Sequence, residues 1–331
     1  MPVLAIAGMM VFQTVNAGVV QGAARTADAA QIQDDKAVYR GYVWRLDEAD
    51  KDGLPRNFRM TNSAFGKADA KFSLDESYVP SRKGLEQLNA SGSAEFSAKE
   101  FAAVVKKIKQ QTSGPIYDID LRQESHGFFN GDAVSWYGKR DWGNIGRTHA
   151  EVLQDEDLRL KMAQGKNIEV DRLNKQKEKG QIKQELAVKV MREEDLAHAG
   201  GVRYVRITAT DHVWPDERCI DEFISFYKQL PKDAWLHFHC EAGVGRTTTF
   251  MALYDMMRNP DVSLKDILYR QHLLGGTYLA YAPTDEKKWR TQYYNEKSVR
   301  IRQFYDYVQA NQANGFQTSW SAWLSQVKQA K

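Results

Sequence analysis

The chain has 331 residues, of which 42% are hydrophobic and 11% aromatic, so it can bury a substantial core and form a main domain with a smaller one. Its 46 basic and 43 acidic side chains give a net charge of +3, which excludes the large basic excess of a nucleic-acid-binding domain. The sequence shows no internal repeat and no low-complexity tract. A site for an anionic ligand must therefore arise from local charge.

The first thirty residues differ in composition from the rest. Residues 3–12 form an apolar run of the length found in signal peptides, and small residues follow from Ala17 to Ala30. No Lys or Arg precedes Arg25, so the usual basic start is missing. We interpret residues 1–30 as a signal peptide and processing region; the alternative is a fortuitous apolar tail. The run is too short to span a bilayer, so we predict a secreted, periplasmic or cell-surface protein with no integral membrane segment after cleavage.

The middle of the chain alternates helix and strand patterns. Residues 96–109 predict an amphipathic helix, and residues 116–121 predict a buried strand. Residues 168–171 and 186–190 have strand-like patterns on either side of the polar stretch 174–180. These patterns predict a hairpin that lies outside the main α/β core.

A strand-like stretch, residues 202–207, leads into Thr-Asp-His-Val-Trp-Pro-Asp at residues 210–216. The segment offers two carboxylates, Asp211 and Asp216, that could donate a proton to a leaving group. The residues by themselves leave both candidates open.

A cysteine and an arginine separated by five residues follow an apolar strand pattern at residues 235–239. The run from Cys240 to Arg246 contains two glycines and leads into an apolar helix that ends before Pro260. In a strand–loop–helix turn of this kind, backbone N–H groups and the positive end of the helix converge on one point. The sequence therefore predicts an oxyanion site.

The chemistry of that loop predicts a role for each of its main residues. Cys240 is the predicted nucleophile, because a helix N-terminus and a nearby cation favour the thiolate. Arg246 offers a planar fork for two phosphate oxygens, and Thr247 can donate its hydroxyl to the sulfur. Gly243 and Gly245 can take positive φ and let the backbone wrap around a phosphate.

The other loop residues are expected to act through their backbone. Glu241, Ala242 and Val244 present amides to the phosphate, and we interpret His239 as a hydrogen-bonding residue that orients the loop. A buried structural cysteine and a sulfur-transfer loop are the alternatives; a sulfur-transfer enzyme needs no separate proton donor.

A predicted helix at residues 286–308 places Arg290, Tyr294, Lys297 and Ile301 on one stripe by three-and-four spacing. The spacing alone does not tell whether this stripe faces a ligand or solvent.

The loop, the Asp211 segment and several flanking strings resemble the cysteine phytases, the protein-tyrosine-phosphatase-like inositol polyphosphate phosphatases of anaerobic gut bacteria. The resemblance covers nearly all of the chain after about residue 40. The strings that carry it are residues 42–47, 54–59, 114–127, 135–138, 233–240 and 263–272.

The resemblance implies roles for further residues. Protein-tyrosine phosphatases place their acid after a Trp-Pro pair, which would select Asp216. In the cysteine phytases, by contrast, the acid matches Asp211, and the residue matching His212 contacts substrate. We follow the phytases, which leaves Asp216 as the expected N-cap or first-turn residue of the next helix.

Four more positions match substrate-contacting residues of that family: Arg45, Asp141, Arg290 and Lys297. Position 290 departs from the usual lysine, and an arginine keeps the charge but changes the hydrogen-bond geometry. Myo-inositol hexakisphosphate carries so much negative charge that its pocket needs several cations besides the loop.

We therefore predict an α/β fold: a protein-tyrosine-phosphatase-like core with a mostly parallel sheet flanked by helices, and a small partial β-barrel. The catalytic domain is predicted at residues 38–331, interrupted at about residues 135–192 by the β-rich unit, which can also use part of residues 38–60.

The predicted reaction is hydrolysis of phosphate monoesters of myo-inositol hexakisphosphate and lower inositol polyphosphates through a cysteinyl-phosphate. The alternatives are a protein-tyrosine or phosphoinositide phosphatase with the same chemistry, and a catalytically inactive inositol-phosphate binding module. We expect no cofactor, no metal and no nucleic-acid partner, and the sequence leaves the oligomeric state open. Both cysteines, Cys219 and Cys240, are expected to be free, with Cys219 a packing residue.

Overall fold

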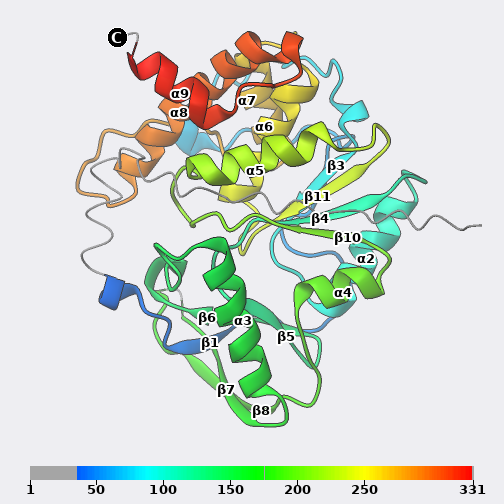
Figure 1. The fold of residues 1–331 in the computed structure, drawn as a ribbon, viewed down its shortest axis with the longest axis vertical. Coiled ribbons are helices and arrows are strands. Elements are labelled where there is room, and N and C mark those ends of the chain that lie inside the picture. Colours follow the sequence, from blue (N-terminus) through cyan, green and yellow to red (C-terminus); the bar gives the residue numbers. More distant parts are fainter. Residues whose placement is uncertain (1–35, 175, 330–331) are drawn as a thin grey trace, which may run out of the picture.

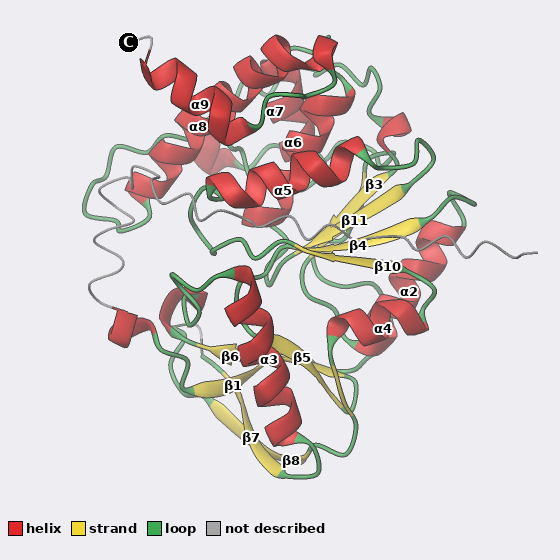
Figure 2. Cartoon of the chain, in the orientation of Figure 1, coloured by secondary structure: helices red, strands yellow, loops and turns green. Residues whose placement is uncertain are grey.

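The computed structural model of the chain describes residues 36–174 and 176–329. The predicted signal peptide, residues 1–30, lies outside the described residues. Two β-sheets with their helices make up the described part, one above the other in the view of Figure 1. The predicted α/β fold class is confirmed, because one sheet is mostly parallel with helices on both sides and the other is an open, curled sheet (Figure 2).

The first sheet has five strands in the order β10-β4-β11-β3-β2. All neighbours in it are parallel except β2, which runs antiparallel to β3. Leu236 and Phe238 of β11 face one hydrophobic cluster and Trp235 faces another, so the sheet is buried on both faces, as parallel sheets usually are. The strands are β2 (Arg59–Met60), β3 (Ala90–Ser93), β4 (Ile116–Asp120), β10 (Arg203–Arg206) and β11 (Trp235–His239).

Helices lie on both sides of this sheet (Figure 1). Those on one side are α5 (Glu217–Lys228), α6 (Gly245–Arg258), α7 (Leu264–Leu273), α8 (Thr291–Asn311) and α9 (Trp320–Gln329). Those on the other side are α2 (Ala98–Lys109) and α4 (Glu193–Ala199). Within residues 36–174 and 176–329, no helix combines the length and the apolarity that a bilayer crossing requires.

Local capping explains where two of these helices begin. α2 starts at a capping box in which Ser97 and Glu100 exchange hydrogen bonds. α5 starts at Asp216, whose carboxylate accepts a hydrogen bond from the amide of Cys219 at 2.8 Å. The prediction that Asp216 caps this helix is confirmed.

The second sheet has six strands in the order β8-β7-β1-β6-β5-β9 and is open at both edges. Only the β1–β7 pair among these strands is parallel. The helix α3 (His149–Ala163) lies across it in Figure 2, and Leu160 of α3 packs with Trp44 and Val170 of the sheet. The strands are β1 (Val43–Glu48), β5 (His126–Phe129), β6 (Asp132–Tyr137), β7 (Asn167–Arg172), β8 (Gln181–Leu186) and β9 (Val190–Met191).

Two predicted elements have different residue ranges in the structure. The hairpin partner of β7 is β8 at residues 181–186, not residues 186–190, of which Val190 pairs with β5 instead. β8 is an edge strand with mostly exposed side chains, so its sequence lacks the apolar pattern that the prediction relied on. The helix predicted at residues 286–308 runs from Thr291 to Asn311.

Candidate active site

The predicted strand–loop–helix turn is present: β11 ends at His239, and α6 begins at Gly245. Cys240 is 1% exposed, and the Thr247 hydroxyl donates a hydrogen bond to its Sγ at 3.2 Å. Gly243 has a φ of +70°, and a Cβ there would lie 2.3 Å from the backbone of the β3 end, so this position requires glycine. Of the two glycines that can take positive φ, Gly245 does not use this freedom, because it is the first residue of α6.

Arg59 supports the Cys240 loop through hydrogen bonds, a role that the sequence did not indicate. Its guanidinium donates to the carbonyl of Gly243 at 2.8 Å and to the hydroxyl of Thr248 at 3.1 Å. Burial lowers the pKa of Arg59 to about 10. Because Arg59 binds the loop through a carbonyl, it helps turn the loop amides the other way, toward the space where a phosphate would lie.

Arg246 is 2% exposed and forms a bidentate pair with Glu124. Its Nη1 and Nη2 donate hydrogen bonds to the two carboxylate oxygens at 2.7 and 2.9 Å. Burial raises the pKa of Glu124, but the charges of Arg246 and Arg122 outweigh this and hold it well below its usual range. The permanent Glu124 carboxylate fixes the plane of the guanidinium. Its Nε, which lacks a hydrogen bond, lies 3.2 Å from Asp211.

Asp211 lines the cavity and forms an ion pair with Arg246, and aromatic side chains hold the acid segment in place. The indole N–H of Trp142 donates to the Asp211 carbonyl at 2.9 Å, and the ring of Trp289 lies 5.1 Å from that of His212. Burial raises the pKa of Asp211, but Arg246 and His212 outweigh it, and the net shift is downward. Burial lowers the pKa of His212 to about 4, so this imidazole is neutral at pH 7.

The other candidate acid, Asp216, is absent from the residues that line the cavity, because its carboxylate caps α5. The geometry therefore favours Asp211 as the proton donor.

A cavity of about 770 Å³ opens above Cys240. It is lined by segments of both sheets: the loop after β11 and the start of α6 from one, the end of β6 and the β7–β8 turn from the other, together with the region around the start of α8. Ten predicted site residues line it: Cys240, Glu241, Ala242, Val244, Gly245, Asp211, His212, Asp141, Arg290 and Lys297.

Cations surround this cavity. Lys297 of α8 is 6% exposed, and burial lowers its pKa to about 8. Arg290, the residue that precedes α8, lines the same cavity, so the predicted stripe does face the site. The lining contains four more basic side chains whose place in the site the sequence did not indicate: Arg56, Lys139, Arg140 and Lys177.

Arg45 does not line the cavity, contrary to the contact expected from the resemblance. Arg45 is 2% exposed. Its Nη1 lies 2.9 Å from Asp141 and its Nε forms an ion pair with Asp47, so two carboxylates compensate its charge outside the cavity. Burial raises the pKa of Asp141 to about 7 even with Arg45 beside it. Arg45 therefore positions Asp141, which does face the cavity.

Both cysteines are free and buried. Cys219 packs in the main hydrophobic cluster, as predicted. Burial raises the pKa of the Cys219 thiol well above its usual range, so Cys219 stays a thiol.

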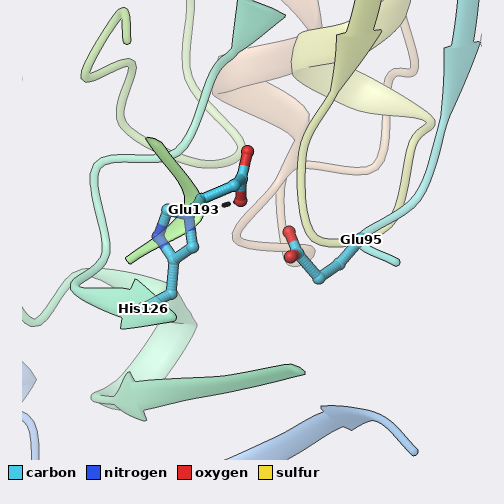
Figure 3. A group of neighbouring side chains, drawn as sticks. All are labelled: Glu95, His126 and Glu193. Atoms are coloured by element: carbon cyan, nitrogen blue, oxygen red, sulfur yellow. Dashed lines mark hydrogen bonds and ion pairs between the residues drawn. The ribbon is translucent and has the colours of Figure 1, made fainter. Parts of the chain in front are cut away.

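Two overlapping groups of buried side chains in the described ranges have the chemistry of a divalent-cation site. One consists of Glu95, His126 and Glu193 (Figure 3), and the other of Asp118, His239 and Glu193. None of these residues lines the cavity. They are the described residues that could hold a metal ion, and they lie behind the Cys240 loop.

A parallel sheet whose strand–loop–helix turn carries Cys240 and Arg246, with an aspartate facing the arginine, defines a protein-tyrosine-phosphatase-like protein. The family model of the PTP-like phytases, described as "Inositol hexakisphosphate", matches residues 119–258, which include this turn and the acid segment.

Solved structures agree with this class. The tandemly repeated protein tyrosine phosphatase like phytase of Mitsuokella multacida is 51% identical to the chain with a TM-score of 0.84; the match covers 91% of this chain and 52% of that one. The same values hold for the PTP-like myo-inositol phosphatase of this organism in complex with myo-inositol-(1,3,4,5)-tetrakisphosphate. A PTP-like phytase from Bdellovibrio bacteriovorus is 34% identical with a TM-score of 0.67, over 86% of this chain and 95% of that one. The chain belongs to the PTP-like phytase family.

A more distant relative is the effector protein hopD2 of Pseudomonas syringae pv. tomato, 27% identical over 251 residues, which are 74% of this chain and 53% of that protein. The chain thus spans about half the length of hopD2 and of the Mitsuokella structures.

Proposed function

We propose that this protein is a phosphatase that hydrolyses phosphate monoesters of myo-inositol hexakisphosphate and of lower inositol polyphosphates. The observation that carries the proposal is a single cavity that combines the Cys240 loop, Asp211 and the cations Arg290 and Lys297. The loop serves the phosphate that reacts, and Arg290 and Lys297 serve phosphates that do not react.

In the first step, the Cys240 thiolate attacks phosphorus and the ester P–O bond breaks. Asp211 gives its proton to the departing inositol oxygen, while Arg246 and the loop amides stabilise the charge on the equatorial oxygens. A bound phosphate brings negative charge next to Asp211 and takes up Arg246, and both changes raise the pKa of Asp211 above its value in the free enzyme. Bound substrate therefore favours the protonated form of Asp211.

In the second step, water attacks the cysteinyl-phosphate. Asp211 accepts the proton of the water, the S–P bond breaks, and inorganic phosphate leaves with Cys240 again a thiolate. The Thr247 hydroxyl, at 3.2 Å from Sγ, stabilises the departing sulfur.

Competing initial rates on phytate and on a phosphotyrosyl peptide test the substrate class. A kcat/KM for phytate well above that for the peptide is the expected result, because the cations beyond the loop have no phosphate to bind in a phosphopeptide. A preference for the peptide would overturn the proposal in favour of a protein-tyrosine phosphatase.

Export remains part of this proposal. It is supported by the apolar run at residues 3–12 and the small residues after it. An N-terminus between Ala17 and Ala30 on protein recovered outside the bacterial cytoplasm would agree, and an intact Met1 on active protein would contradict it.

A further inference from the structure

Glu193, the first residue of α4, lies between the two sheets and contacts a histidine of each. One carboxylate oxygen is 3.0 Å from Nε2 of His126 on β5, and the other is 2.6 Å from Nε2 of His239 on β11. The three side chains are at most 1% exposed. Figure 3 shows Glu193 reaching His126, with Glu95 nearby. A carboxylate shared in this way ties one sheet to the other.

The His239 end of this bridge leads to the nucleophile. His239 directly precedes Cys240, and its Nδ1 is 3.4 Å from the Glu95 carboxylate. The backbone amide of Glu95 donates to the carbonyl of Glu241, the residue after the cysteine, at 3.1 Å. Glu95 therefore contacts His239 through its side chain and Glu241 through its backbone, so it holds the loop on both sides of Cys240.

The His126 end leads to the arginine of the loop. The Nδ1 of His126 is 2.9 Å from the backbone carbonyl of Glu124, and the side chain of Glu124 holds Arg246. His126 also belongs to the sheet whose β6 end leads to Asp141, on the opposite side of the cavity. A shift of His126 would thus change both the support of Arg246 and the width of the cavity.

We propose that Glu193 is a positioning residue of the active site: by joining His126 and His239 it fixes the Cys240 loop and the separation of the two sheets that wall the cavity. The inference rests on the proposed function and adds to it a residue that never touches substrate.

Charge balance supports the bridge. Around His239 lie Glu193, Asp118, Glu95 and the neutral His237; around His126 lie Glu193, Asp120, Glu156, Arg122 and Arg206. Burial lowers the pKa of His239, but Glu193 and Asp118 outweigh it and raise the value well above the usual range. In the same way, acidic neighbours raise the pKa of His126 to about 10 against burial and Arg122. Among the described residues, Glu193 is the carboxylate that forms an ion pair with both rings, whereas the other carboxylates pair with one ring each.

The test compares Glu193→Gln with Glu194→Gln. Glutamine keeps the size of the side chain, but it has no charge, and its NH2 cannot accept a hydrogen bond from the N–H of the second histidine ring. Glu194, the next residue, pairs with Arg192 on the surface and serves as the matched control. Kinetics are measured on p-nitrophenyl phosphate, which needs only the loop, and on phytate, which spans the cavity.

For Glu193→Gln we expect kcat on p-nitrophenyl phosphate to fall about 10- to 100-fold, because a displaced loop loses the attack geometry. We expect KM for phytate to rise as well, because the two sheets that wall the cavity lose the side chain that joins them. Glu194→Gln should behave as wild type. Wild-type kcat and KM in Glu193→Gln would overturn the inference, as would an equal loss in both variants.

Two measurements on the wild-type protein keep the inference testable if Glu193→Gln does not fold. Long-range proton–nitrogen NMR spectra should show a proton on Nε2 of both His126 and His239, the two nitrogens that contact Glu193, and an unprotonated Nε2 at either position would overturn the inference. A stoichiometric divalent metal in the purified protein would also overturn it, because Glu193 would then be a ligand. Wild-type turnover of p-nitrophenyl phosphate without turnover of phytate would refute the proposed substrate and leave the Glu193 test intact.

Discussion

Replacement of Asp211 by Asn tests the proton donor with little change of shape. The asparagine keeps the backbone carbonyl that accepts the Trp142 indole N–H, so the acid segment should stay in place. It cannot give a proton to the leaving inositol oxygen. A positioned acid contributes about 10²- to 10⁴-fold, so kcat on phytate should fall by this factor, or about 3–5 kcal/mol in the barrier.

The leaving group provides an internal check on this reasoning. p-Nitrophenolate departs readily as an anion, so the loss in Asp211→Asn should shrink to less than about tenfold with p-nitrophenyl phosphate. The pH dependence should change too. Arg246 and His212 keep the pKa of Asp211 low in the free enzyme, so wild-type kcat/KM declines as the pH rises from acidic values, and the variant should lose this decline.

Asp216→Asn is the matched control, because asparagine caps a helix as well as aspartate does. Its kcat should stay near wild type, and α5 should stay folded. A larger loss in Asp216→Asn than in Asp211→Asn, or a loss in Asp211→Asn that is equal for phytate and p-nitrophenyl phosphate, would refute the assignment of Asp211.

Three further predictions follow from the site and the fold. Cys240→Ser should abolish turnover and leave phytate binding measurable by calorimetry; residual turnover above background would contradict a cysteine nucleophile. The pKa of Lys297 is about 8, so KM for phytate should rise above that pH in the wild-type protein. Lys297→Met should have a raised KM already at pH 6, with no further rise above pH 8. An unchanged KM at pH 6 in this variant would show that Lys297 does not bind substrate. Ser97→Ala removes the capping box of α2 and should lower the free energy of unfolding by about 1 kcal/mol in denaturant titrations, with kcat unchanged.

The turn around Cys240 could be predicted from the sequence because its determinants are local. The strand at residues 235–239 is rich in apolar residues and buried throughout, Gly243 is required within the loop, and α6 follows directly. The cap at Asp216 is equally local, since its carboxylate reaches an amide three residues away. The strand β8 escaped prediction because an exposed edge strand carries no apolar alternation.

The supporting residues could not be predicted in this way. Arg59 meets Gly243 and Glu124 meets Arg246 only because strands far apart in the chain lie side by side. Arg45 shows the converse: a cation matched to a substrate contact turns out to be neutralised beneath the cavity wall. Spacing in the sequence identifies the residues that are expected to react. Burial and ion-pair partners on distant strands determine whether a charged side chain is available to a ligand or paired within the protein.

The central claim is that Cys240 carries the phosphoryl group during turnover. Its most direct test is rapid acid quench of the enzyme with excess phytate in the first turnover, followed by mass spectrometry of the peptide that contains Cys240. The account predicts one phosphoryl group on that cysteine, with more trapped in Thr247→Ala, where the sulfur leaves more slowly. Full turnover with no phosphoryl group on Cys240 in either protein, or with the group on another residue, would contradict it.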